Sequence, residues 1–354
     1  MINAIKFWGG GEQWYWQVAT GLRDRGHAVT IAGRRDGVFL ERFDNSGIPT
    51  LPLRMQSDYG PGDVLTLRRW LTSHGPVAVI CNLTRDVRLI GLAASGLPGV
   101  RIIWAMGSIL IRNRWRDRSL VSRSVDRIVV PSESLAAELR GLGYILPSII
   151  SVVPIGLDLD LWGAIPPRHS TNGEDGGSPI VGVFGRLEAR KGHRFLLDAW
   201  TGVCSRYPQA VLWIAGTGSE ETVLHEQARA LGLEDRIRFW GFQSDVRTIL
   251  TKVDLVVQPS LYEPFGIILL EAMACGRPIV CTTAGGMPEV VDRACARLVP
   301  PGDPQALESE IIRVLGDRER SSAMGEAGRR RVEEQFGLPL MLDRVESVIA
   351  QVMR

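Results

Sequence analysis

The sequence predicts an α/β protein built from two Rossmann-like domains that face each other across a deep cleft. Two series of short runs rich in β-branched residues alternate with longer amphipathic segments, a pattern typical of buried parallel strands joined by helices. A stretch rich in proline, glycine, serine and charge separates the two series. With 354 residues and a hydrophobic content of 45%, the chain can bury two cores.

The first series predicts a domain over residues 1–164. Its expected strands occupy residues 27–33, 77–82, 100–106 and 127–132. Helical patterns lie between strands, for example at residues 12–26 and 132–143, where Ser132 caps the second helix and glycine ends it.

The second series predicts a domain over residues 180–337, after a linker or exposed loop at residues 165–179. Its expected strands occupy residues 179–186, 210–218, 237–242, 254–260 and 277–283. A last helix, at about residues 338–354, is expected to pack back on the first domain. Because open α/β sheets bind ligands at the carboxyl ends of their strands, we expect the site in the cleft between the domains.

The composition excludes several classes of protein. Basic and acidic side chains number 41 and 39, so a nucleic-acid-type charge is absent, although residues 1–165 form the more basic part. Five scattered cysteines predict reduced thiols in a cytoplasmic protein, and no spacing of cysteine or histidine suggests a metal site. We expect no signal peptide and no membrane-spanning helix.

A run of three glycines, in the segment FWGGGEQW at residues 7–14, forms a turn between a further strand expected at the start of the domain and the first helix. Gly10 and Gly11 would let backbone N–H groups approach a phosphate or a sugar closely. A tight turn without a ligand is the alternative, because a glycine run alone has little specificity. The run is not the G-x-G-x-x-G fingerprint of dinucleotide-binding proteins.

Two cations, Arg186 and Lys191, follow the first strand of the second domain and are flanked by Gly185 and Gly192. They suit a diphosphate, whose negative charge needs partners in a desolvated cleft. A solvated pair at the end of a strand is the alternative. His193 either touches the phosphate as well or only packs beside this loop.

The segment SLYEPFGIILLEAMACGRPIV, from Ser260, carries Glu263 before an apolar helix and Glu271 inside it. Gly266 permits a tight turn, the helix begins near Ile267, and N–H groups at a helix start bind anions. Alternatively, one glutamate is solvated and the other is stabilised by the helix dipole.

Two further segments allow more than one interpretation. Asp158 and Asp160 form an Asp-Leu-Asp triplet of a kind that can bind a divalent metal, but it lies far in sequence from the other candidates and we expect no metal. Residues 112–123 form either a solvated helix face or a patch that attaches to an anionic membrane surface beside Trp115. The basic residues of this patch are Arg112, Arg114, Arg116, Arg118 and Arg123. Nucleic-acid binding lacks a recognisable module.

Together these segments resemble glycosyltransferase family 4, the retaining glycosyl transferases group 1 of GT-B architecture. The likeness covers nearly the whole chain and is most specific at residues 181–301, through VGVFGRLEARKG, EPFGIILLEAMACGRPIV, TTAGGMPEVV and LVPPGDPQAL. The segments DRIVVPSESLAAEL and VVPIGLD match the end of the family's first domain, except that Ile155 stands where asparagine is usual. A histidine that many relatives carry near the transferred sugar is also missing, so Met106, Gly107 or Ser108 would have to replace it.

The resemblance implies a cofactor-free, metal-independent enzyme that moves a sugar from a UDP- or GDP-sugar with retained configuration. Glu263 would contact hydroxyls of the donor sugar and Glu271 those of the ribose, both as ionised carboxylates. Arg186 and Lys191, at the surface of the cleft, would stabilise charge on the departing diphosphate. The remaining donor-binding residues would be Gly10, Gly11, Gly185, Phe265, Gly266, Ile267 and Ile268.

The resemblance also implies a glycan or lipid-linked acceptor, held by the first domain, in lipopolysaccharide or other cell-envelope polysaccharide synthesis. The enzyme would be cytoplasmic, with peripheral attachment to the inner face of the membrane through residues 112–123. A soluble small-molecule acceptor is one alternative. A catalytically silent nucleotide-binding scaffold is a second, suggested by the missing histidine. A nucleotide-dependent oxidoreductase is a third, and the absent dinucleotide fingerprint argues against it.

Overall fold

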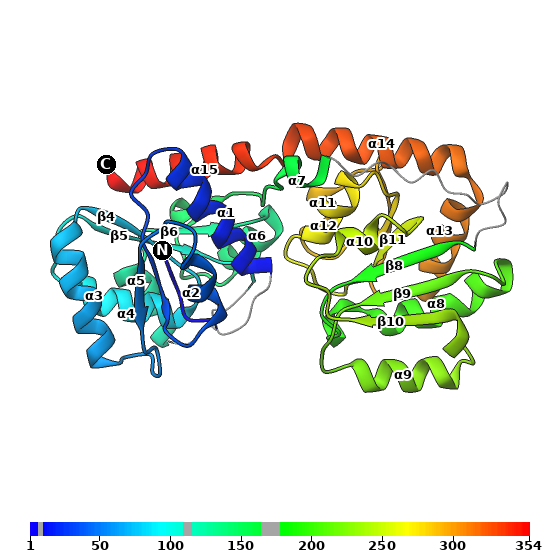
Figure 1. Cartoon of the computed structure of the whole chain (residues 1–354), viewed down its shortest axis with the longest axis horizontal. Helices are drawn as coiled ribbons and strands as arrows, with labels where there is room; N and C mark the ends of the chain where they lie inside the picture. Colours follow the sequence, from blue (N-terminus) through cyan, green and yellow to red (C-terminus); the bar gives the residue numbers. More distant parts are fainter. Residues whose placement is uncertain (6–9, 109–114, 164–177) are drawn as a thin grey trace. The chain divides into compact units, whose positions relative to one another are not determined.

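The structure is a computed structural model in which two compact units can be distinguished (Figure 1). It describes residues 1–5, 10–108, 115–163 and 178–354. The first unit consists of Met1–Ile155 together with Leu338–Arg354, and the second of Gly156–Gly337.

The division between the units falls before the expected boundary at residue 164. Residues 156–163 belong to the second unit because a short helix, α7 (Leu159–Gly163), packs on its helix α11 (Ile267–Ala274). Of the expected linker at residues 165–179, all but the last two positions lie outside the described residues.

The first unit is built on a parallel sheet of seven strands. They are β1 (Ile2–Asn3), β2 (Ile31–Arg34), β3 (Thr50–Leu53), β4 (Val77–Cys81), β5 (Val100–Ala105), β6 (Arg127–Val130) and β7 (Ile150–Val152). Their order is β3-β2-β1-β4-β5-β6-β7. Strands β2 and β3 are therefore added on one side of β1, and strands β4 to β7 on the other side. The predicted α/β class with parallel strands is confirmed.

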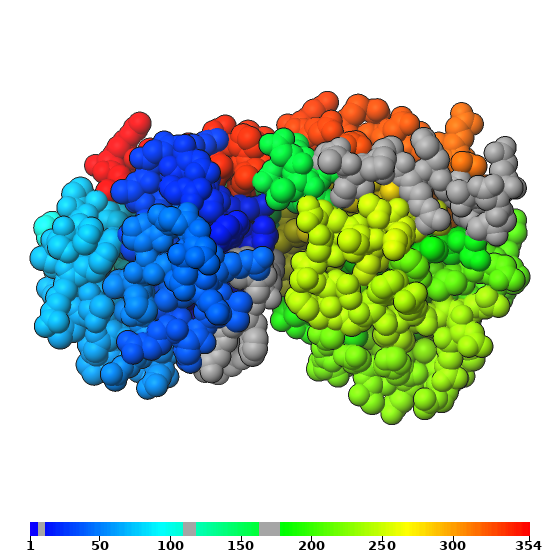
Figure 2. Space-filling model, viewed as in Figure 1, coloured from blue at the N-terminus to red at the C-terminus, as the bar shows by residue number. Residues whose placement is uncertain are grey.

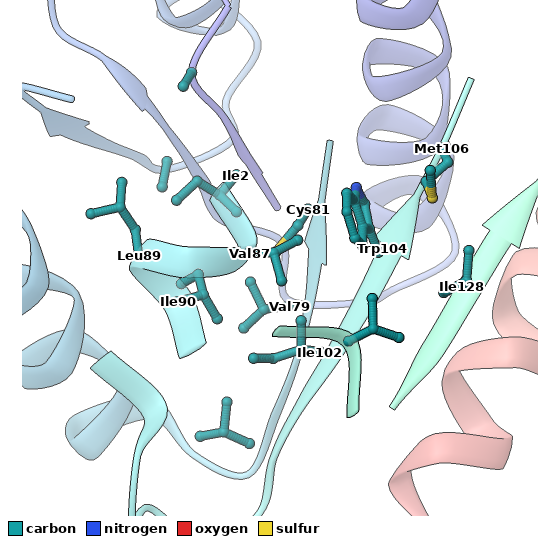
Figure 3. Packing of buried hydrophobic residues seen from close by; sticks show 14 of the residues in the cluster. Ile2, Val79, Cys81, Val87, Leu89, Ile90, Ile102, Trp104, Met106 and Ile128 are labelled. Carbon is teal, nitrogen blue, oxygen red and sulfur yellow. The ribbon is translucent and has the colours of Figure 1, made fainter. Parts of the chain in front are cut away.

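Helices cover both faces of this sheet. They are α1 (Gly10–Asp24), α2 (Val38–Phe43), α3 (Pro61–His74), α4 (Thr84–Ala94), α5 (Trp115–Ser124), α6 (Glu133–Gly141) and α15 (Leu338–Met353). Because side chains alternate along a strand, Val79 joins an apolar layer with Trp104 (Figure 3), whereas Ile80 joins the opposite layer with Tyr15. The side chain of Ser132 accepts a hydrogen bond from the N–H of Leu135, so the predicted cap of α6 is confirmed.

The last helix, α15, returns to the first unit and packs on α1 and β4. Leu342 fits against α1 at Gly21, where a Cβ atom would lie only 2.4 Å from Leu342 Cδ1. Beside this contact, Arg25 forms ion pairs with Asp343 at 2.7 Å and Glu346 at 2.5 Å. The buried residues of α15 are Met341, Leu342, Val345, Val348 and Val352. The outer side of the helix is visible in red in Figure 2.

The second unit is built on a parallel sheet of six strands in the order β10-β9-β8-β11-β12-β13. The strands are β8 (Ile180–Phe184), β9 (Val211–Ala215), β10 (Ile237–Gly241), β11 (Leu255–Gln258), β12 (Ile279–Thr282) and β13 (Ala296–Val299). Besides α7 and α11, its helices are α8 (His193–Arg206), α9 (Glu221–Ala230), α10 (Arg247–Leu250), α12 (Met287–Val290), α13 (Pro304–Gly316) and α14 (Arg318–Gln335). In Figure 1, α14 runs beside α11 and α13.

The neighbouring strands β8 and β11 mark the point where the order of the second sheet reverses. From β8 the chain continues to β9 and β10 on one side, and from β11 it continues to β12 and β13 on the other. In open α/β sheets a ligand-binding crevice forms at the carboxyl ends of the strands at such a point.

Candidate active site

The predicted donor-binding residues of the second unit lie at this reversal of strand order. β8 ends at Phe184 and leads through Gly185 to a short 3-10 turn, Ala189–Lys191, before α8 begins. β11 ends at Gln258 and leads to the N-terminus of α11. Two loops that are distant in sequence are therefore brought together because their strands are paired.

Close backbone contacts hold these loops in place. The carbonyl of Arg190 accepts a hydrogen bond from the N–H of Leu261 at 2.8 Å. At Gly192, which has a φ of +69°, a Cβ atom would lie 2.0 Å from the carbonyl oxygen of Pro259. Glycine is required there by both the close approach and the left-handed backbone.

A third segment, after β12, fixes the backbone of Glu263. Its carbonyl accepts a hydrogen bond from the N–H of Gly286 at 2.9 Å. At Gly285, with a φ of +58°, a Cβ atom would lie 2.1 Å from the same carbonyl oxygen. The TTAGG segment thus has a physical role in this site, since its glycines allow contact with the loop that carries Glu263.

Lys191 and Glu263 form an ion pair, with 2.5 Å between Nζ and Oε2. Their side chains are only 13% and 10% exposed. Lys191 was expected at the surface of the cleft; within the second unit its side chain is largely buried against Glu263. In this pair a cation suited to a phosphate and a carboxylate suited to sugar hydroxyls neutralise each other.

Arg186 differs from Lys191 in its surroundings. Its side chain is 71% exposed, and its guanidinium pairs with Glu188 at 2.8 Å. The second carboxylate oxygen of Glu188 pairs with Arg190, also at 2.8 Å. The sequence interpretation overlooked Glu188, which pairs with both arginines. Gly185 adjoins the Lys191–Glu263 pair, since a Cβ atom at this glycine would lie 3.7 Å from Lys191 Nζ.

The N-terminus of α11 follows directly after Glu263. Helix α11 begins at Ile267 as predicted, and Gly266 precedes it with a φ of 99°. No side chain caps this end among the described residues, so the first N–H groups are available to an anion. Ile267 and Ile268 are half-buried, and Phe265 is buried with its ring 6.1 Å from that of Phe336.

Glu271 lies on the second turn of α11 and is half-buried. Burial, with a smaller effect of the negative charge of Asp245, raises the pKa of its carboxyl to about 8. In the described part of the chain this carboxyl makes no hydrogen bond or ion pair, although the backbone carbonyl of Glu271 accepts from the N–H of Cys275. Without a ligand the group is therefore largely protonated at neutral pH.

His193 opens α8 and is buried, which agrees with the packing alternative rather than contact with a phosphate. Neither ring nitrogen has a hydrogen-bond partner within the described residues. Burial, followed by the positive charge of Lys191, lowers the pKa of His193 to about 4, so the ring is neutral at physiological pH.

Gly10 and Gly11 begin α1 in the first unit, and Gly11 is exposed. The next residue, Glu12, is buried, and its Oε1 accepts hydrogen bonds from the side-chain amides of Asn3 at 3.3 Å and Asn82 at 3.5 Å. The sequence interpretation overlooked this carboxylate. Its position in a first helical turn, beside a glycine run, was the available signal.

Met106 is not a substitute for the missing histidine. Its side chain is 1% exposed and belongs to the apolar layer of β4 and β5, as Figure 3 shows. Gly107 is exposed and Ser108 is half-buried, so these two remain of the three residues proposed for that role.

The two aspartates of the Asp-Leu-Asp triplet are joined by a hydrogen bond, which the N–H of Asp160 donates to Asp158 Oδ1 at 3.2 Å. In the described residues no group of three or more His, Cys, Asp or Glu side chains is arranged to hold a metal. No helix there is both long and apolar enough to cross a membrane.

Only part of the predicted arginine patch can be placed. Arg112 and Arg114 lie outside the described residues, and the side chain of Arg116 is not described either. Arg118 is exposed and its guanidinium lies 5.3 Å from the ring centroid of Tyr144. Arg123, near the end of α5, is exposed as well.

Comparison with known families and proteins agrees with this geometry. Residues 166–331 match Glycosyl transferases group 1, and residues 8–161 match Glycosyltransferase Family 4. The D-inositol 3-phosphate glycosyltransferase of Segniliparus rotundus is 33% identical over 221 residues, which is 60% of this chain and 49% of that protein. The lipopolysaccharide core biosynthesis glycosyltransferase LpsE of Rhizobium meliloti is 32% identical over 174 residues, 49% of this chain and 50% of that protein. The chain thus spans about half the length of these two relatives.

Solved structures show the same fold. The crystal structure of Anabaena HepE in complex with UDP matches with a TM-score of 0.85 over 99% of this chain and 98% of that one, at 23% identity. Two parallel α/β sheets of seven and six strands are the GT-B-like architecture expected from the sequence. Since the two family matches follow one another along most of the chain, this protein belongs to glycosyltransferase family 4, the glycosyl transferases group 1.

Proposed function

We propose that this protein is a metal-independent, retaining glycosyltransferase that moves a sugar from a UDP- or GDP-sugar to a glycan or lipid-linked acceptor. The observation that carries the proposal is the buried Lys191–Glu263 pair at the N-terminus of α11, with Glu271 one helical turn further on. A cation and a helix N-terminus suit the diphosphate. Two carboxyls suit the hydroxyls of the hexose and of the ribose.

In the proposed reaction, the bond between the anomeric carbon and the diphosphate oxygen breaks while a bond to the acceptor oxygen forms on the same face. Lys191 and the N–H groups of Ile267 and Ile268 stabilise the charge that develops on the diphosphate. Arg186 contributes after its guanidinium exchanges Glu188 for a phosphate. The departing diphosphate accepts the proton of the acceptor hydroxyl, because no side-chain nucleophile or base is assigned.

Glu263 and Glu271 orient the donor. Once Lys191 interacts with the diphosphate, both oxygens of Glu263 can accept hydrogen bonds from sugar hydroxyls. Glu271 accepts bonds from the ribose hydroxyls when it is ionised, so nucleotide binding favours release of its proton.

Support for the donor and acceptor classes comes from similar proteins. HepE of Anabaena has been crystallised with UDP-glucose, and LpsE is named for the lipopolysaccharide core. The exposed Arg118 and Arg123 suit an anionic membrane surface, which a lipid-linked acceptor would share. We therefore place the enzyme in the cytoplasm, with weak peripheral attachment at the inner face of the membrane. A soluble acceptor would not require this patch.

The test is a thermal-shift panel of UDP-, GDP- and ADP-sugars, followed by transfer and hydrolysis assays with any donor that stabilises the protein. Stabilisation by one nucleotide class and turnover of its sugar would support the proposal. Absence of stabilisation by every nucleotide would refute it. Binding without turnover would favour the silent scaffold, for which the missing histidine and the buried Met106 are the specific observations.

A further inference from the structure

Gln258 is a buried polar residue at the end of an otherwise apolar strand, LVVQ, directly behind Glu263. It is 1% exposed. A buried amide has a desolvation cost that hydrogen bonds must offset, so its partners indicate why it is there. Its Nε2 lies 2.8 Å from Ser260 Oγ and 3.4 Å from Glu263 Oε2.

A neighbouring contact fixes the position of Ser260, the hydrogen-bond partner of this amide. Thr282, at the end of β12, donates its hydroxyl to the carbonyl of Ser260 at 2.5 Å. Gln258, Ser260 and Thr282 are all buried, so the ends of β11 and β12 are joined by side chains as well as by the sheet. The NH₂ group of Gln258 faces the carboxylate because the amide oxygen would repel it.

Lys191 and Gln258 donate to the same oxygen of Glu263, Oε2. A diphosphate in the site competes for the ammonium of Lys191, since phosphate oxygens attract it strongly. Gln258 cannot be drawn away in the same manner, because it is neutral and enclosed. The amide therefore still donates to Glu263 when Lys191 interacts with a ligand.

We propose that Gln258 is a positioning residue that holds the carboxylate of Glu263 toward the donor sugar after Lys191 has turned to the diphosphate. This inference rests on the proposed function, in which Glu263 contacts the sugar and not the nucleotide. It follows that loss of the Gln258 amide impairs recognition and turnover of the nucleotide sugar and leaves binding of the free nucleoside diphosphate unchanged.

The test compares Gln258→Met with wild type and with Gln17→Met, a control that changes another buried glutamine, on α1 of the first unit. We expect Gln258→Met to lower kcat/KM for the nucleotide sugar by roughly 10- to 100-fold, the size typical of a hydrogen bond to a charged group. Affinity for the free nucleoside diphosphate, measured by calorimetry, should stay within about twofold. In a Glu263→Ala background the same change should have no further effect, because its target is gone.

Gln258→Glu provides a readout that a purely structural role would not change. Two carboxyls facing each other share a proton, so the new side chain can donate to Glu263 only when it is protonated. Its activity relative to wild type should therefore rise as pH falls. Wild-type kcat/KM in Gln258→Met, or an equal loss of nucleoside diphosphate affinity, would overturn the positioning role while leaving the donor site intact. A wild-type protein that binds neither the nucleotide nor the nucleotide sugar would instead refute the donor site, and this role with it.

Discussion

Replacing Lys191 with methionine should reduce both catalysis and stability. Methionine keeps most of the aliphatic stem and removes the ammonium, so Glu263 loses its charged partner at 2.5 Å. With only 10% of its side chain exposed, the carboxylate cannot regain full hydration. Removing one partner of a buried pair typically costs about 3–5 kcal/mol. Because Gln258 still donates to the same oxygen, we expect the lower end, about 3 kcal/mol.

The assay is urea unfolding of wild type, Lys191→Met and the double variant Lys191→Met/Glu263→Gln. The double variant carries neither charge, so it should recover most of the lost stability. It should not recover transfer, which in both variants should fall by about 100-fold or more because the group that stabilises the leaving diphosphate is gone.

A matched control is Lys252→Met, which removes an exposed lysine from the same unit. That change should stay within about 1 kcal/mol of wild type, the most that an exposed ion pair typically contributes. If Lys191→Met is no more destabilising than the control, the ion pair is not a buried one and the reasoning fails. Near-normal transfer by a folded Lys191→Met protein would refute the assignment of the donor site.

Four further outcomes are expected. Affinity for the nucleoside diphosphate should increase as pH rises through about 8, where Glu271 ionises, and Glu271→Gln should remove this dependence and cost roughly 1–3 kcal/mol of binding, both measurable by calorimetry. Since the folded pKa of Glu271 lies above its ordinary value of 4.5, the group's contribution to unfolding free energy should decline between about pH 4.5 and 8, and Glu271→Gln should remove that slope in urea unfolding. Gly285→Ala should destabilise the protein by about 2–4 kcal/mol, through backbone strain and collision with the carbonyl of Glu263, whereas Gly47→Ala, with a φ of +73° and open space, should cost only about 1 kcal/mol. Co-sedimentation with anionic vesicles should be weak and salt-sensitive, and changing the arginines at residues 112–123 to glutamine should abolish it; binding that persists in that variant would contradict the patch.

The sequence predicted most of the strands and the helix starts because local chemistry determines them, but β3, β7 and β13 were not among the expected strands. β-branched runs became β4 and β8, Ser132 capped α6, and Gly266 preceded α11. The family motifs also singled out Lys191 and Glu263, which the structure brings together as an ion pair. These are features that a few consecutive residues can specify.

What the sequence could not show depends on tertiary packing. Lys191 and Glu263 are 72 positions apart, and only the pairing of β8 with β11 brings them into contact and buries them. The raised pKa of Glu271 likewise comes from desolvation, which no spacing encodes. In the sequence, Met106 was a possible replacement for the missing histidine, yet the sheet directs its side chain into the apolar layer.

The return of α15 to the first unit affects the order in which the protein can be assembled during synthesis. Residues 338–353 supply five buried side chains to that unit and emerge from the ribosome after the whole of Gly156–Gly337. The second unit can therefore complete its core while the first still exposes the apolar surface that α15 will cover. During translation the N-terminal unit is finished last, and until then its open flank is a surface that chaperones can bind.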